Sequence, residues 1–121
     1  MLVAFCARGE GFDSQLDPRF GRCPFFILAD SESGKVVEVI SNDNSSASGG
    51  SGPQSAQMLA EKKVDAVLAG NVGPNAVTAL KAAGIEIYRG GDEPVGEAIK
   101  NFGLGKYEKI FDATVESHHG M

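Results

Sequence analysis

The sequence lacks the features that mark several large classes of protein. It has no apolar stretch near the roughly 20 residues that a membrane-spanning helix needs. Its net charge of −5 leaves no basic excess for non-specific binding to nucleic acid or to a membrane surface. The apolar opening, residues 1–7, is too short for a secretory signal and lacks the basic segment of one. We therefore expect a cytoplasmic protein that binds neither nucleic acid nor membrane.

Cysteine and histidine are equally scarce, and this limits the metal chemistry. Cys6 and Cys23 have no secretory context, so they indicate free thiols rather than a disulfide framework. There is no C-x-x-C pair and no spaced Cys/His set, so a tight zinc or iron–sulfur site is not indicated. His118 and His119 are predicted to belong to a C-terminal tail.

The motifs of nucleotide binding and of hydrolysis are also missing. No Walker phosphate loop and no G-x-G-x-x-G pattern occurs, and neither paired carboxylates nor a serine–histidine arrangement is visible. We therefore expect a binding protein rather than an enzyme, with a small hydrolase as the least favoured alternative.

What the sequence does contain is the pattern of one α/β domain of 121 residues. Short apolar or alternating runs predict five strands, at residues 2–7, 25–30, 35–41, 64–69 and 85–88. Helices are predicted from Pro53 with an apolar stripe at 56, 59, 60 and 63, over 74–83, and around 95–102. We expect the domain to span 1–102, with 103–121 as an extension and flexible tail.

The order of these elements predicts how the loops are arranged. Three strands followed by α-β-α-β-α indicate a mixed five-stranded sheet with helices on its faces, in a layout that resembles a ribonuclease H-like fold. The first strand carries none of the acidic residues that nucleases of that fold need. Crossover connections make the fourth and fifth strands parallel to the first. The loops 8–24, 42–52, 70–73 and 89–91 should then emerge at one sheet edge, where open α/β sheets bind ligands.

All the arginines of the chain fall in these edge loops, whereas the seven lysines lie elsewhere. This distribution favours an anion site at the edge, and helix starts near 51–53 and 72–75 add backbone N–H donors there. The alternative is that the arginines only pair with acidic neighbours in the same loops. The arginines are Arg8, Arg19, Arg22 and Arg89, and the acidic neighbours are Glu10, Asp13, Asp17 and Asp43.

One segment, residues 17–26 (DPRFGRCPFF), is much richer than a plain turn requires. Pro18 and Pro24 fix the backbone at both ends, and Gly21 permits conformations closed to other residues. Its arginines suit anions, and Cys23 brings a soft metal ligand. Cys23, beside Arg22, is the better candidate of the two cysteines for a lowered pKa, while the sequence leaves open whether Cys6 or Cys23 would ligate a metal. The alternative is that this segment is only a loop joining two strands, with its arginines exposed to solvent and binding no ligand.

Together with 49–53 (GGSGP), 67–76 (VLAGNVGPNA) and 79–85 (ALKAAGI), this segment resembles the dinitrogenase iron–molybdenum cofactor biosynthesis family, NifX/NifB-like small carriers. The resemblance covers about residues 1–102. It implies a ribonuclease H-like fold without nuclease activity. It also implies loose, non-covalent binding of an anionic iron–molybdenum, molybdenum–copper-sulfide or iron–sulfur cluster that the isolated protein can lack.

From the resemblance and the edge loops we predict a non-catalytic carrier that exchanges a cluster with donor and acceptor proteins. The predicted binding residues are Arg19, Arg22, Cys23, Ser48, Gly49, Gly50, Gly70, Asn71, Gly73 and Arg89, with Cys23 as the candidate metal ligand. Relatives often carry a histidine where this chain has Ser48, so no imidazole ligand is available there. The alternative is a regulatory or protein-interaction module of the same fold that binds no cluster.

Overall fold

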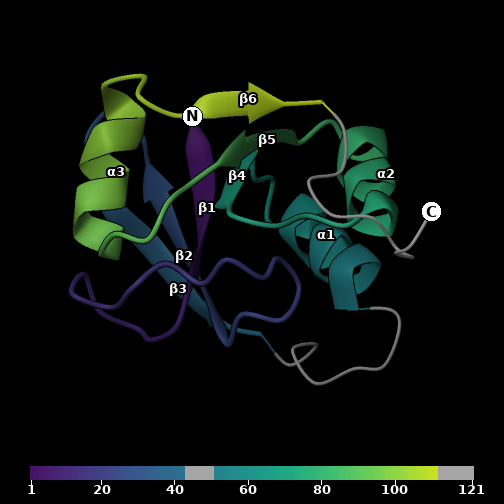
Figure 1. The fold of residues 1–121 in the computed structure, drawn as a ribbon, viewed down its shortest axis with the longest axis horizontal. Helices are drawn as coiled ribbons and strands as arrows, with labels where there is room; N and C mark the ends of the chain where they lie inside the picture. The colour runs from purple at the N-terminus through teal and green to yellow at the C-terminus, as the bar shows by residue number, and fades with distance from the viewer. Residues whose placement is uncertain (43–50, 112–121) are drawn as a thin grey trace.

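The computed structural model of the protein describes residues 1–42 and 51–111, which form a mixed α/β fold. A six-stranded sheet has α3 on one side and α1 and α2 on the other (Figure 1). None of these helices is both long enough and apolar enough to cross a membrane. In chain order the elements are β1 (Leu2–Ala7), β2 (Phe25–Asp30), β3 (Val36–Ser41), α1 (Ser51–Glu61), β4 (Ala66–Ala69), α2 (Pro74–Ala82), β5 (Glu86–Arg89), α3 (Val95–Gly103) and β6 (Glu108–Ile110).

The strand order β3-β2-β1-β4-β5-β6 places β1 near the centre of the sheet. β1 pairs antiparallel with β2 and parallel with β4, and β5 runs parallel to β4. The predicted strand directions are therefore confirmed. The carboxyl ends of β1, β3, β4 and β5 and the start of β2 share one edge, although residues 43–50 of the loop 42–52 lie outside the described part.

Strand β1 is apolar throughout because both of its faces are buried. Ala4 and Cys6 join the core under α1 and α2, whereas Val3 and Phe5 join the core under α3. This strand separates the two cores, so a change in it disturbs both sides of the sheet.

Two details of the predicted fold are wrong. The sheet has a sixth strand, β6, which pairs antiparallel with β5 through Ile87 and Ile110. It has three residues, two of them exposed, so it shows no alternation that a sequence pattern could reveal. The apolar stripe predicted on the first helix does not extend to Lys63, because α1 ends at Glu61. Lys63 lies beyond the helix and has a left-handed backbone conformation with φ 61°.

Candidate functional site

The segment after β1 is held against the turn that follows β4. The Asp17 amide donates to the Cys6 carbonyl at 2.8 Å, which fixes the segment at the end of β1. The Asn71 amide donates to the Pro18 carbonyl at 2.5 Å, and the Phe20 amide donates to the Asn71 carbonyl at 3.1 Å. Residues 17–20 therefore lie between the ends of two parallel strands, at the edge where ligands bind in open α/β sheets.

Two glycines allow this close approach. A Cβ atom on Gly70 would lie 2.9 Å from Pro18 Cβ and 3.1 Å from Pro18 Cα, so only glycine fits against the segment there. Gly21 has φ 89°, a conformation that other residues rarely adopt, and it lets the Arg22 and Cys23 amides turn back to the Arg19 carbonyl.

The Arg19 guanidinium is engaged within its own segment. Nε donates to Asp17 Oδ1 at 3.0 Å and a terminal nitrogen donates to Oδ2 at 2.8 Å. The Asp17 carboxylate has no exposed surface, whereas the Arg19 side chain is 59% exposed. Burial acts to raise the pKa of Asp17, but the hydrogen bonds from Arg19 and the nearby charge of Arg8 outweigh it and lower that pKa. The pair is a rigid local anchor with little net charge.

Beside this anchor lies an open cavity of about 390 Å³, referred to below as the edge pocket. The ends of three parallel strands contribute to it, because Arg8 follows β1, Gly70 follows β4 and Arg89 ends β5. Its lining residues are Arg8, Pro18, Gly70, Asn71, Arg89, Gly90, Gly91 and Asp92.

The charge of the edge pocket is positive on balance. Among the described residues, Arg19 is the only arginine with a carboxylate within ion-pair distance. Arg8 and Arg89 line the pocket without such a partner, and Asp92 contributes one opposing carboxylate. The alternative in which every arginine is neutralised by an acidic neighbour is therefore not observed in this part of the chain. Two guanidinium groups beside glycine backbone suit an anion.

Comparison with known proteins identifies the family. The sequence model for "Dinitrogenase iron-molybdenum cofactor" matches residues 1–105. The chain belongs to the dinitrogenase iron–molybdenum cofactor family. A further relative is the uncharacterized protein MJ0580 of Methanocaldococcus jannaschii, which is 35% identical over 100 residues, or 81% of this chain and 85% of that protein.

Solved structures of similar proteins have the same fold. The apo form of the orange protein from Desulfovibrio gigas has a TM-score of 0.88 at 33% identity, covering 94% of this chain and 96% of that one. A putative NifB protein from Thermotoga has a TM-score of 0.81 at 40% identity, covering 94% and 97%. The family resemblance that the sequence motifs indicate is thus confirmed.

Within this family fold, the predicted site residues separate into groups. Gly70, Asn71 and Arg89 line the edge pocket. Arg19 is bound to Asp17, and Arg22 is exposed but does not line the pocket. Gly73 is the N-cap of α2, with no atom of a distant residue near where a side chain would start. The remaining predicted positions Ser48, Gly49 and Gly50, like His118 and His119, lie outside the described residues.

The predicted set missed five residues that line the pocket: Arg8, Pro18, Gly90, Gly91 and Asp92. Arg8 comes directly after β1, and residues 90–92 form the turn after β5, so the position at the end of a parallel strand was the available signal for these four. Gly90 also has a packing role, because a Cβ atom there would lie 3.0 Å from Leu68 Cγ.

Both cysteines lie in the core under α1 and α2, with no exposed surface. The Cys6 and Cys23 thiols are close enough to influence each other. Burial raises the pKa of Cys6, and the Cys23 contact and the Asp17 charge add to the effect. No group of three or more potential metal-binding side chains occurs within residues 1–42 and 51–111. Metal ligation by Cys23 stays a prediction, and it would require the segment that covers this thiol to open.

Proposed function

We propose that this protein is a non-catalytic carrier that holds an anionic metal–sulfur cluster without covalent bonds in the edge pocket, during metallocluster assembly or delivery. The observation that carries the proposal is the pairing of Arg8 and Arg89, neither with a carboxylate partner among the described residues, around a glycine-lined cavity of about 390 Å³. Its volume falls within the range of small-ligand sites.

The chemistry of the lining matches such a cargo. Guanidinium groups are weakly hydrated and planar, so they suit a large, diffuse anion better than a compact ammonium group would. Glycine backbone at Gly70, Gly90 and Gly91 allows the cluster to approach main-chain N–H donors without obstruction by side chains. Asp92 is the one carboxylate among the described lining residues, which therefore offer no pair of groups for general acid–base hydrolysis.

The family to which the chain belongs also supports the proposal of a cluster carrier. Its description refers to the iron–molybdenum cofactor, and the orange protein structure is of an apo form. We propose an iron–molybdenum, molybdenum–copper-sulfide or iron–sulfur cluster as cargo, with cluster donors and acceptors as partners in the cytoplasm. The ribonuclease H-like description of the fold belongs to the same proposal. Arg22 and the segment Ser48–Gly50 are proposed as outer contacts, and Arg19 and Gly73 as supports of the pocket edge.

One observation favours a second candidate, a regulatory or protein-interaction module of the same fold. Asp92 in the lining repels an anion and offers a partner protein an acidic contact beside two arginines. In that case the edge would recognise a peptide surface of mixed charge and would bind no cluster.

Anaerobic reconstitution separates the two candidates. The purified protein is mixed with tetrathiomolybdate, with tetrathiomolybdate and Cu(I), or with an iron–sulfur cluster donor, then desalted and analysed for metal, sulfide and visible absorption. The carrier proposal expects a coloured protein with a fixed metal-to-protein ratio from at least one of these. A colourless protein that retains no metal from any of them would contradict the carrier proposal and favour the interaction module.

A further inference from the structure

The turn that follows β5 brings one negative charge into the edge pocket. It carries two neighbouring acids, Asp92 and Glu93, whose surroundings differ. The Glu93 carboxylate accepts a hydrogen bond from the Tyr107 hydroxyl, and Glu93 does not line the pocket. Asp92 is exposed and lines the pocket together with Arg8 and Arg89. Of this acidic pair, only Asp92 therefore lies where an anion would bind.

The backbone on either side of Asp92 is attached to other parts of the molecule. The Gly90 amide donates to the Ala69 carbonyl at 3.1 Å, at the end of β4. The Leu16 amide, in the segment after β1, donates to the Glu93 carbonyl at 3.0 Å. Asp92 lies between these two attachments, so the turn cannot carry its carboxylate away from the pocket.

Neither an ion pair nor helix capping accounts for the Asp92 carboxylate. It has no ion-pair partner within residues 1–42 and 51–111. It does not cap the helix that follows, because the N-cap of α3 is Pro94 and no side chain makes a capping hydrogen bond there. A carboxylate with neither role, at the rim of a cationic pocket, acts mainly on the charge that a ligand meets.

We propose that Asp92 is a specificity-determining residue of the edge pocket, which weakens the hold on a multiply charged anion and so allows the cargo to be released. This inference rests on the proposed function and deepens it. Arg8 and Arg89 bring two positive charges to the described lining and Asp92 one negative charge, which leaves one net positive charge. The arginines attract a dianion and the carboxylate repels it, and both forces grow with the charge of the anion. A carrier benefits from this balance, because differences in affinity at one site appear mostly in the rate of release.

Two anions of the same shape separate the effect of charge from that of size. Tetrathiomolybdate is a tetrahedral dianion, and tetrathiorhenate is a tetrahedral monoanion. Asp92→Asn keeps the size of the side chain and removes its charge. In anaerobic titrations followed by visible absorption, it should raise the association constant of the dianion about tenfold and that of the monoanion about threefold, since the electrostatic free energy scales with ligand charge. Slower displacement of bound tetrathiomolybdate by excess tetrathiotungstate should account for most of the gain.

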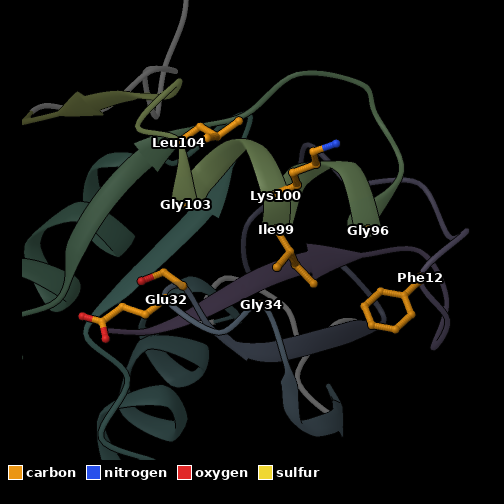
Figure 2. Close-up of a pocket in the computed structure, with 9 residues that line it drawn as sticks. Phe12, Glu32, Gly34, Gly96, Ile99, Lys100, Gly103 and Leu104 are labelled. Atoms are coloured by element: carbon orange, nitrogen blue, oxygen red, sulfur yellow. The ribbon is translucent and has the colours of Figure 1, made fainter.

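Two further variants are the matched controls. Asp92→Glu keeps the charge and should bind both anions within about twofold of the unchanged protein. Glu32→Gln removes an exposed carboxylate from another cavity, of about 430 Å³, which lies between α3 and the turn that joins β2 to β3 (Figure 2). Asp30 at the end of β2 pairs with Leu2 at the start of β1, so that turn lies at the opposite edge of the sheet. A charge there is screened from the edge pocket, and its removal should leave both association constants unchanged.

The expected result is tighter binding of both anions by Asp92→Asn, with the larger gain for the dianion. The inference is overturned if Asp92→Asn binds the dianion no more tightly than the unchanged protein, if both anions gain equally, or if neither protein retains a thiometallate. Uptake by Asp92→Asn alone would support the inference, because it shows that the carboxylate opposes anion binding. The carrier proposal is judged separately, by whether the unchanged protein retains any of the clusters offered in the reconstitution. Circular dichroism verifies that every variant is folded.

Discussion

The Asp17 carboxylate, with no exposed surface, is bound by the half-exposed Arg19 guanidinium through two hydrogen bonds of 3.0 and 2.8 Å. It also accepts a third hydrogen bond, from the Arg19 amide at 2.9 Å. The Asp17 amide is in turn bonded to β1, so this pair connects the central strand to the segment that borders the edge pocket. Arg19 is thus committed to Asp17, while Arg8 and Arg89 line the edge pocket with no ion-pair partner within residues 1–42 and 51–111.

Asp17→Asn should therefore destabilise the protein by about 1–3 kcal/mol, because it leaves the buried end of this network with an amide that cannot accept every bond. Urea unfolding measures the change. Asp13→Asn, at an exposed position of the same loop, is the control and should have little effect. Equal small effects of both substitutions would contradict a structural role for the pair.

The same pair predicts how stability depends on pH. The pKa of Asp17 is lowered in the folded protein, so the folded state binds this proton less readily than the unfolded chain does. Its contribution is fully present above the unfolded value of about 3.9 and is lost as pH falls through the lower folded value. The unchanged protein should lose more stability than Asp17→Asn over that acidic range. The pKa values of Asp30 and Glu86 are also lowered by hydrogen bonds. Because both proteins contain these two residues, the difference between their pH profiles reports the contribution of Asp17 alone. Parallel pH profiles would argue against this contribution.

Gly70→Ala should push the segment at Pro18 away from the end of β4. The new methyl group would lie 2.9 Å from Pro18 Cβ, and the backbone of the segment is held by the Asn71 amide, so strain of about 1–3 kcal/mol is expected. Gly73→Ala is the matched control, because its extended backbone and open surroundings accept a methyl group at less than about 1 kcal/mol. Thermal unfolding compares the two, and a Gly73→Ala variant that is less stable than Gly70→Ala would contradict the close approach.

The two thiols should be protected in the folded protein. Cys6 and Cys23 have no exposed surface, and the pKa of Cys6 is raised, so a thiol reagent should react slowly at neutral pH until denaturant exposes both groups. Titration with an aromatic disulfide reagent, with and without denaturant, gives the two rates. Rapid reaction of either thiol in the native protein would show that the segment over Cys23 opens readily.

Much of this arrangement was predictable from local patterns. Strands β1 and β2 have the predicted bounds because continuous apolar runs flanked by polar turns leave little choice of register. The edge shared by the loops follows from strand direction alone. Strand β6 was not predictable, since its three residues gain their order from pairing with β5 rather than from burial.

The roles of the four arginines depend on tertiary contacts that spacing does not encode. Arg19 and Arg22 stand three residues apart in one motif, yet Arg19 turns back onto Asp17, and neither lines the edge pocket. The sequence places Arg8 among the edge arginines but gives no reason to single it out as a binding residue. Arg8 lines the pocket beside Pro18, whose segment is held at the end of β4 by a hydrogen bond from Asn71.

The affinity of Arg8 and Arg89 variants for a thiometallate tests the central claim most directly. Tetrathiomolybdate, with Cu(I) where reconstitution requires it, is titrated anaerobically and followed by its visible spectrum. Each of Arg8→Gln and Arg89→Gln should lower the association constant by about tenfold to a hundredfold, because each removes one charged donor. Lys35→Gln, which removes one charge at the opposite edge of the sheet, should leave it within about twofold. A double variant Arg8→Gln/Arg89→Gln that binds as tightly as the unchanged protein would contradict the edge pocket as the cluster site.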